Sequence, residues 1–406
     1  MATVFEAEQL SVKRTPIAYL NMRNPQLLKY YYKFKTLQMI DKEDISGSSP
    51  PDIFVGRFGY PNVFIGPLVP PMLGDTSEMG LPETWVNKTI PEIVEARSML
   101  VRGMQKENIH NVDDSRTGSM LQELAIADRY ASVDMRLARR PNLTIKFDEN
   151  SQPFGPSAPL KLMSVGNTKT NKQMEKAYAD TAMPAGTGMV ELYEKGIEVS
   201  RIQKILAAGG LGMKNNRKFV PTRWSITAVD DTLSKYRLST VKETDSIEQI
   251  TVFEDVALDN RWLVLLFPGA WSYELVEAWY PNTTWNQDTK NIAIFSSSEF
   301  FAGRKTYAEI GGCYYAARLA SSEYLNKIGK QARVVILRET HPGYIMPVGV
   351  WNVREHVRAA LKTEPLHFDS LQSTLNFIGV KMAIPVTEWI KNSAVLRDII
   401  HQRVLA

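Results

Sequence analysis

Hydrophobic and polar positions along the chain follow two different periods. Apolar residues recur at helical spacing in residues 25–40, 90–107, 119–131, 190–206 and 304–329, and in most of roughly the last 50 residues, where Pro385 marks a break. Shorter strand-like runs cover residues 53–55, 63–65, 143–147, 160–162, 262–267, 273–276 and 334–337. Because these runs do not alternate strictly with helices, the pattern predicts an α+β fold. We expect mixed, largely antiparallel sheets with packed helices, in a two-part architecture.

Two segments interrupt this pattern. Residues 46–51, SGSSPP, predict a turn. Residues 165–186 are rich in Asn, Thr, Lys, Gly and Ala and predict either an exposed connector or a substrate loop. A chain of 406 residues exceeds what one hydrophobic core normally supports. We therefore place a boundary at the connector, between an N-terminal region of residues 1–165 and a C-terminal region of residues 166–406.

Composition narrows the class of protein. Hydrophobic residues make up 44% of the chain and charged residues 23%, which is ordinary globular usage. A net charge of +4 is compatible with nucleic-acid binding but does not by itself indicate it. The start of the chain lacks the pattern of a secretory signal, and no run of about 18 apolar residues exists, so we expect a cytoplasmic protein without membrane contact. Cys313 is the single cysteine, so we expect neither an internal disulfide nor a structural zinc site.

The sequence contains no phosphate loop of the form G-x-x-x-x-G-K-[ST], no G-x-S-x-G elbow and no H-E-x-x-H motif. Residues 207–218, AAGGLGMKNNRK, are the nearest substitute for a phosphate-binding loop. Their glycines can present backbone N–H groups to a phosphate, assisted by Lys214, Arg217 and Lys218. The alternative is a helix C-cap followed by a loop, which the order of the segment favours because the glycines follow a helix.

The segment 217–237, RKFVPTRWSITAVDDTLSKYR, alternates like a strand from Val220 to Val229 and then reaches Asp230 and Asp231. Adjacent carboxylates at a strand end can hold a hard divalent cation, Mg²⁺ or Mn²⁺, which would activate water for phosphodiester hydrolysis. The alternative is that one aspartate caps a helix beginning at TLSKYR. Arg223 joins the preceding cations as a candidate phosphate contact.

The segment 333–358 carries a second polar group. A buried strand at residues 334–337 leads to Arg338 and Glu339, and Arg354 follows on a predicted helix. The arginines can grip phosphate with two hydrogen bonds, and Glu339 can act as a metal ligand or base. The alternative is a structural pair of arginine and glutamate.

Near the N-terminus, Arg57 lies between glycine-rich strands beside Phe58 and Tyr60. A cation between two aromatic side chains can present a stacking face to nucleic-acid bases. The alternative is a packed turn in which the aromatic rings are buried.

Long stretches of the chain resemble the archaeal Nre proteins. The residues that carry the resemblance are PPDIFVGRFGYPNVFIGPLVPP (50–71), RKFVPTRWSITAVDDTLS (217–234), PGAWSYELVEAWYP (268–281), GGCYYAARLASSEYL (311–325) and LRETHPGYIMPVGVWNVRE (337–355). They follow one another through both halves of the chain. The resemblance implies a two-part DNA-repair protein whose partners are DNA, other repair proteins and, in many relatives, the sliding clamp.

The chain departs from that family pattern twice. Many relatives carry an N-terminal zinc site of four cysteines, which this chain cannot form. Many also end in a clamp-binding peptide with paired aromatic residues, whereas this chain ends in LRDIIHQRVLA. We therefore do not expect it to bind the clamp through such a peptide.

Three functions remain open at this stage. The first is a DNA-repair protein that binds damaged or non-duplex DNA through basic and aromatic residues. The second is a metal-dependent DNA phosphodiesterase that uses Asp230, Asp231 and Glu339. The third is a nucleotide-processing enzyme that uses the glycine- and lysine-containing segment 209–218 and the loop from Arg338 to Arg354. Because no diagnostic catalytic signature is present, we rank DNA binding first.

Overall fold

The computed structural model describes residues 40–141, 151–166, 168–283, 285–286, 288 and 290–404. The helix predicted at 25–40, apart from Ile40, and the strand predicted at 143–147 lie outside these residues. The described residues form two compact units. We call residues 40–233 with 347–349 the N-terminal unit, and residues 234–346 with 350–404 the C-terminal unit. The division at residue 165 between two family-type regions stays a prediction.

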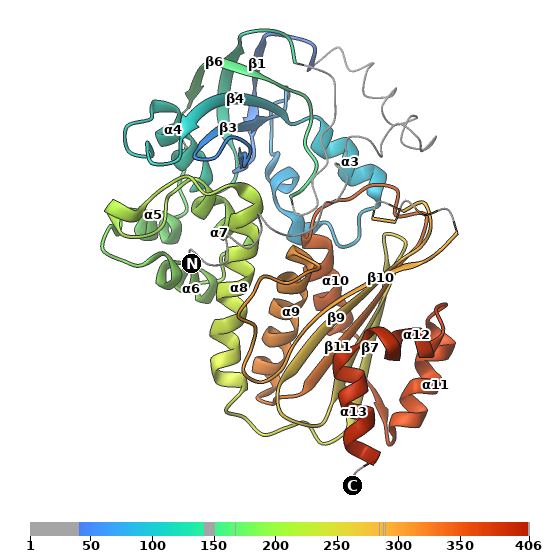
Figure 1. The fold of residues 1–406 in the computed structure, drawn as a ribbon. Coiled ribbons are helices and arrows are strands. Elements are labelled where there is room, and N and C mark those ends of the chain that lie inside the picture. Colours follow the sequence, from blue (N-terminus) through green and yellow to red (C-terminus); the bar gives the residue numbers. More distant parts are fainter. Residues whose placement is uncertain are drawn as a thin grey trace. The chain divides into compact units, whose positions relative to one another are not determined.

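The N-terminal unit contains a mixed six-stranded sheet (Figure 1). Its order is β1 (Asp44–Ser49), β5 (Ala131–Leu137), β6 (Ser157–Val165), β4 (Val101–Asn108), β3 (Asn62–Val69) and β2 (Ile53–Val55). β4 and β6 run parallel and every other pair is antiparallel. Alternate residues of these strands, such as Val63, Ile65 and Val133, point into one buried apolar cluster.

Helices complete this unit. They are α3 (Ile90–Ser98), α4 (Arg116–Ala125), α5 (Lys172–Ala179), α6 (Ala185–Glu194), α7 (Val199–Ala207) and the start of α8 (Thr222–Val241), with short 3-10 turns at Ser77–Gly80, Pro82–Thr84 and Lys214–Asn216. α4 and α7 contact the sheet, and Leu121, Leu124 and Ala207 enter its core.

The strands predicted at 53–55 and 63–65 are confirmed, and they pair as a hairpin. The helix predicted at 119–131 is present but spans Arg116–Ala125, since β5 begins at Ala131. Residues 46–49 form a strand instead of the predicted turn, because their backbone pairs with β5 and Gly47 passes where a Cβ would lie 1.9 Å from the Pro70 carbonyl oxygen. The predicted helix at 90–107 ends at Ser98, since β4 pairs with two strands. The predicted helix at 190–206 is two helices, separated where Gly196 has a φ of 78°.

The largest correction concerns the strand predicted at residues 220–229, because residues 222–229 form part of helix α8. Ile226, Val229, Leu233 and Val241 are buried at steps of three, four and eight residues, which is the period of a helix face. Residues 165–186 are also not a connector throughout, because they contain helix α5.

The C-terminal unit contains a second mixed six-stranded sheet. Its order is β10 (Ala293–Glu299), β9 (Ser272–Trp279), β11 (Arg333–Thr340), β8 (Asn260–Phe267), β7 (Ile250–Ala257) and β12 (Leu366–Phe368). β9 and β11 are parallel and every other pair is antiparallel. Val335 and Leu337 pack with α11 (Leu371–Lys381), α12 (Val386–Asn392) and α13 (Ala394–Val404) on one face, whereas α9 (Gly312–Ile328) and α10 (Trp351–Ala360) cover the other (Figure 1).

The strands predicted at 262–267, 273–276 and 334–337 are confirmed, and Pro385 does separate two terminal helices. The helix predicted at 304–329 begins only at Gly312, since Gly311 has a φ of 73° and ends the preceding turns. With two mixed sheets and packed helices in the described residues, the predicted α+β architecture in two parts is confirmed. Among these residues, no helix is long and apolar enough to cross a membrane.

Candidate nucleic-acid interface

The hairpin formed by β2 and β3 projects an aromatic and basic tip from the N-terminal unit. Short β-branched strands flank residues 56–61, and Gly59 adopts a φ of 82° that the turn requires. Phe58 is 81% exposed, and Tyr60 and Phe64 are also exposed. The guanidinium carbon of Arg57 lies 5.1 Å from the centre of the Phe58 ring. The rings at this tip are thus not buried in a packed turn.

The first turn of α8 lies against the same hairpin. The ring centres of Tyr60 and Trp224 are 5.2 Å apart with an interplanar angle of 56°. The Val55 backbone N–H donates to the Thr222 hydroxyl at 2.9 Å. Because Arg223 lies between Thr222 and Trp224, it belongs to this surface as well.

A third segment contacts the hairpin through backbone hydrogen bonds. The Ile109 N–H donates to the Pro61 carbonyl at 3.0 Å, and the Phe219 N–H donates to the Ile109 carbonyl at 2.9 Å. Lys218 precedes Phe219, the last member of this chain of backbone contacts, and Lys106 on β4 pairs in register with Phe64. We define the hairpin surface by its cations and rings, which are Arg57, Phe58, Tyr60, Phe64, Lys106, Lys218, Arg223 and Trp224.

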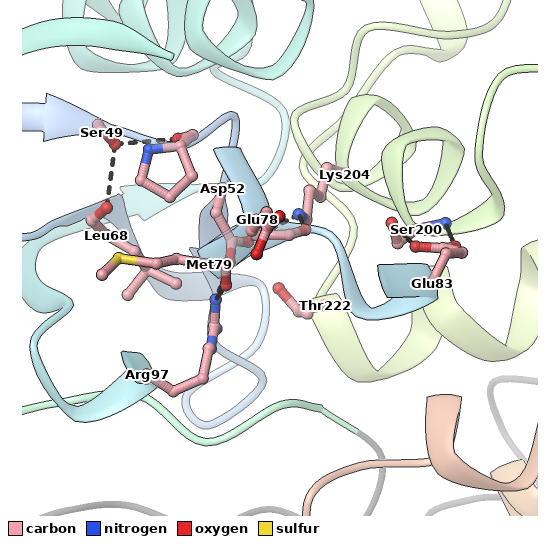
Figure 2. A network of polar contacts seen from close by, with 12 residues as sticks. Ser49, Asp52, Leu68, Glu78, Met79, Glu83, Arg97, Ser200, Lys204 and Thr222 are labelled. Atoms are coloured by element: carbon pink, nitrogen blue, oxygen red, sulfur yellow. Dashed lines mark hydrogen bonds and ion pairs between the residues drawn. The ribbon is translucent and has the colours of Figure 1, made fainter. Parts of the chain in front are cut away.

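A buried ionic network fixes the base of the hairpin (Figure 2). Asp52, immediately before β2, forms ion pairs with Arg97 and with Lys204, whose Nζ lies 3.5 Å from Asp52 Oδ1. Arg97 also donates to the carbonyls of Met79 and Pro153, both at 2.7 Å. Burial lowers the pKa of Lys204, and the charge of Asp52 opposes that shift. These contacts fix the position of Asp52 and therefore of the start of β2.

The segment before α3 is fastened to α7 by the same network. Lys204 donates to the carbonyl of Gly80, and Glu83 accepts from the Ser200 N–H at 2.9 Å and from its hydroxyl at 2.7 Å (Figure 2). Ser49 Oγ donates to the Leu68 carbonyl at 3.0 Å, which ties the strand before the hairpin to the end of β3. Charged groups buried this completely are costly unless they are paired, so the network gives the hairpin a fixed base.

Of the predicted phosphate contacts, Arg57, Lys218 and Arg223 lie on the hairpin surface. Lys214 is exposed in the short 3-10 turn after α7. Arg217 donates to the carbonyls of Gly212 and Tyr178, each at 2.8 Å, so part of its donor capacity holds its own loop. In the glycine-containing loop, Gly209 follows the end of α7 with a φ of 71°, which is the geometry of a helix C-cap.

Asp230 and Asp231 lie side by side in the chain near the middle of α8. Consecutive helix residues point about 100° apart, so the two carboxylates do not share a face. Asp230 is fully buried and accepts from Gln203 Nε2 at 3.2 Å. Within the described residues, no group of three or more His, Cys, Asp or Glu side chains is placed to hold a metal. The metal role of the pair stays a prediction.

Arg338 and Glu339 occupy opposite faces of β11 in the interior of the C-terminal unit. Arg338 pairs with Glu277 under α9 and α10, while Glu339 accepts from the Ile384 and Ala383 N–H groups at 2.8 and 3.1 Å on the other face. Arg354 is buried in α10, where its Nε donates to Glu355 at 3.0 Å. Arginine–glutamate pairs, the structural alternative, are thus present, and the proposed chemical roles of these residues stay predictions.

The sequence pattern did not single out Lys106 or Trp224. Lys106 joins the surface only through the pairing of β3 with β4, which a single sequence does not reveal. Trp224 would have been found if residues 222–241 had been interpreted as a helix, because it then lies in the first turn, next to the candidate cation Arg223.

Comparisons with known proteins cover nearly the whole chain. The family model described as "Archaeal Nre, N-terminal" matches residues 22–286, and the one described as "Archaeal Nre, C-terminal" matches residues 299–406. The chain is 42% identical over 361 residues to the DNA repair protein NreB of Archaeoglobus fulgidus, covering 89% of this chain and 91% of that protein. It is 34% identical over 362 residues to the DNA repair protein NreA of Haloferax volcanii, covering 85% of this chain and 86% of that protein. No solved structure matches the chain.

Proposed function

The chain belongs to the archaeal Nre family, and from this premise we propose that it is a DNA-repair protein that binds DNA through the hairpin surface. The observation that carries the proposal is the meeting of three segments, distant in sequence, that bring four cations and four aromatic rings together. Relatives at 42% and 34% identity are named DNA repair proteins, which supports the repair role.

The chemistry of this surface suits a nucleic-acid backbone with accessible bases. Lysine and arginine neutralise phosphates, which supplies sequence-independent affinity. Aromatic rings stack on bases, and this contribution tolerates any sequence because every base has a flat face. In intact duplex DNA the base faces are covered by their neighbours. The combination therefore favours damaged or non-duplex DNA over undisturbed duplex.

Two other functions have weaker support. Cleavage by a divalent cation at Asp230 and Asp231 would need further metal ligands, and within the described residues no group of three or more His, Cys, Asp or Glu side chains is placed to hold a metal. A nucleotide site at residues 207–218 would need the glycine N–H groups to converge on a phosphate, whereas Gly209 and Gly210 donate to the Leu206 and Ile205 carbonyls. We rank both below DNA binding.

The test compares labelled single-stranded, duplex and forked DNA across a range of salt concentrations, with and without Mn²⁺. We expect binding that weakens with salt and a smaller salt slope in the double variant Lys218→Ala/Arg223→Ala, by about 0.7–0.9 per lost phosphate contact. The matched control is Lys327→Ala/Lys362→Ala, which removes the same charge from exposed positions of the C-terminal unit. Absence of binding, or equal slopes in both double variants, would remove the hairpin surface from the proposal.

A further inference from the structure

Phe58 is placed in an unusual way for a large apolar side chain. It is 81% exposed, yet the tip that carries it is fixed at both ends. The Gly56 N–H donates to the Phe64 carbonyl at 2.8 Å, and the Asn62 N–H donates to the Gly59 carbonyl at 2.8 Å. Burying such a ring is worth about 1.5–3 kcal/mol, which the free protein forgoes. A stiff hairpin with an exposed ring at its end has the form of the apolar wedges that some proteins insert between bases.

Two aromatic positions follow each other closely along the tip. Phe58 and Tyr60 are two residues apart, so their Cα atoms are separated by at most about 7 Å. Successive bases on one strand rise about 3.4 Å, so two base steps cover the same length. Tyr60 is itself paired with Trp224, and the pair presents a broader aromatic surface than Phe58 alone. The tip therefore carries one single ring and one ring pair within a span that two base steps can cover.

Cations flank both aromatic positions. Arg57 lies over the Phe58 ring, and Arg223 precedes Trp224. Lys106 and Lys218 border the hairpin from β4 and from the loop before α8. Glu107 is the nearest acidic side chain along β4, and it accepts from the Asn111 amide at 2.9 Å. A phosphate backbone that passes along the tip would meet positive charge at each aromatic position.

On this basis we propose that the hairpin surface recognises the junction between duplex and single-stranded DNA. Phe58 packs against the last base pair of the duplex as a wedge, and the Tyr60–Trp224 pair stacks on an unpaired base that follows. Unstacking an intact duplex step costs a few kcal/mol, whereas at a junction the step is already open. Phe58 is thus the residue that determines specificity, while the cations supply affinity for any DNA. This inference rests on the proposed function.

The experiment uses the full chain and three labelled DNAs of the same base sequence, an intact duplex, a single strand and a fork. Phe58→Ala should weaken fork binding by roughly tenfold, since one base–aromatic stack is worth about 1–3 kcal/mol. Duplex binding should change less than twofold, and the salt slope should not change because no charge is lost. Leu73→Ala is the matched control, because Leu73 is an equally exposed apolar residue of the same unit outside the hairpin surface.

A second readout reports the stacking itself. A 2-aminopurine placed in the last base pair of the duplex, next to the fork, should change its fluorescence on binding to the wild type and not on binding to Phe58→Ala. Equal losses of fork and duplex affinity in Phe58→Ala, or no loss in either, would overturn the wedge while leaving DNA binding intact. A wild-type protein that binds none of the three DNAs would overturn the proposed function and the wedge together. An unchanged thermal midpoint verifies that Phe58→Ala is folded.

Discussion

Arg338 and Glu277 form an ion pair inside the C-terminal unit, in which Arg338 Nη1 lies 2.7 Å from Glu277 Oε1. The two residues are direct neighbours on the parallel strands β11 and β9. Arg338 also donates to Asn260 Oδ1 at 2.8 Å and lies over the ring of Trp262 at 4.6 Å. Burial by itself would lower the pKa of Arg338, but the charge of Glu277 raises it above its usual value. Together with Asn260, the pair links the three strands β9, β11 and β8 of one sheet.

Breaking this pair should destabilise the protein strongly. Arg338→Met leaves Glu277 charged and buried, so we expect the free energy of unfolding to fall by about 3–5 kcal/mol in chemical denaturation. Arg338→Met/Glu277→Met should recover most of that loss, because no uncompensated charge remains. A stable Arg338→Met variant with a reduced salt slope for DNA would instead assign Arg338 to phosphate binding.

The placement of Asp230 and Asp231 leads to a second prediction. Asp230→Ala should lower the free energy of unfolding by about 1–3 kcal/mol, because the buried Gln203 amide loses the acceptor of its hydrogen bond. Asp231→Asn, which removes the neighbouring charge, is the second variant of this pair. Neither variant should alter the effect of Mn²⁺ on the melting temperature. The contrary result is a rise in the wild-type melting temperature with Mn²⁺ that both variants lose, which would show a bound cation at this pair.

Much of the strand pattern was predictable because it depends on local sequence. The hairpin of residues 53–65 follows from β-branched runs separated by glycines, and Arg57 at its tip was predicted as a nucleic-acid contact on that ground. The opposite orientation of Arg338 and Glu339 also follows from the two-residue period of a strand. That orientation separates two groups that the sequence had placed in one candidate site.

The remaining features depend on packing between distant segments. Residues 220–229 have both an alternating pattern and a helical one, and only their burial along one helix face decides between them. Because these residues form a helix, Asp230 lies in a helix interior and not at a strand end, and Trp224 contacts Tyr60. The network of Asp52, Arg97 and Lys204 joins three segments more than 40 residues apart, so no local pattern could indicate it.

Lys204 leads to a prediction about pH. Its pKa in the folded protein is lowered from 10.5, first by burial and further by Arg97, while Asp52 acts in the opposite direction. Between that lowered value and 10.5 the unfolded chain binds more protons than the folded one, so the contribution of Lys204 to stability rises with pH across this window. The slope for one group is at most about 1.4 kcal/mol per pH unit.

The measurement compares the wild type with Lys204→Met by chemical denaturation at about pH 8 and about pH 10. The wild type should gain stability relative to the variant as pH rises. Lys176→Met is the control, because Lys176 is an exposed lysine of the same unit and its removal should leave the slope unchanged. A constant difference between wild type and Lys204→Met at both pH values would show that Lys204 keeps its ordinary pKa.

The last prediction links the base of the hairpin to DNA binding. Thr222→Val keeps the shape of the side chain but removes the hydroxyl that accepts from the Val55 N–H, so a donor at the root of the tip loses its partner. We expect the free energy of unfolding to fall by about 1–3 kcal/mol. Fork affinity should fall as well, because a loosened tip must be ordered again on binding, whereas the salt slope should not change since every cation remains. Thr222→Ser, which retains the hydroxyl, should behave like the wild type in both assays. If Thr222→Val loses stability but binds forked DNA as tightly as Thr222→Ser does, then the bond to Val55 supports the fold without holding Phe58 in its binding position.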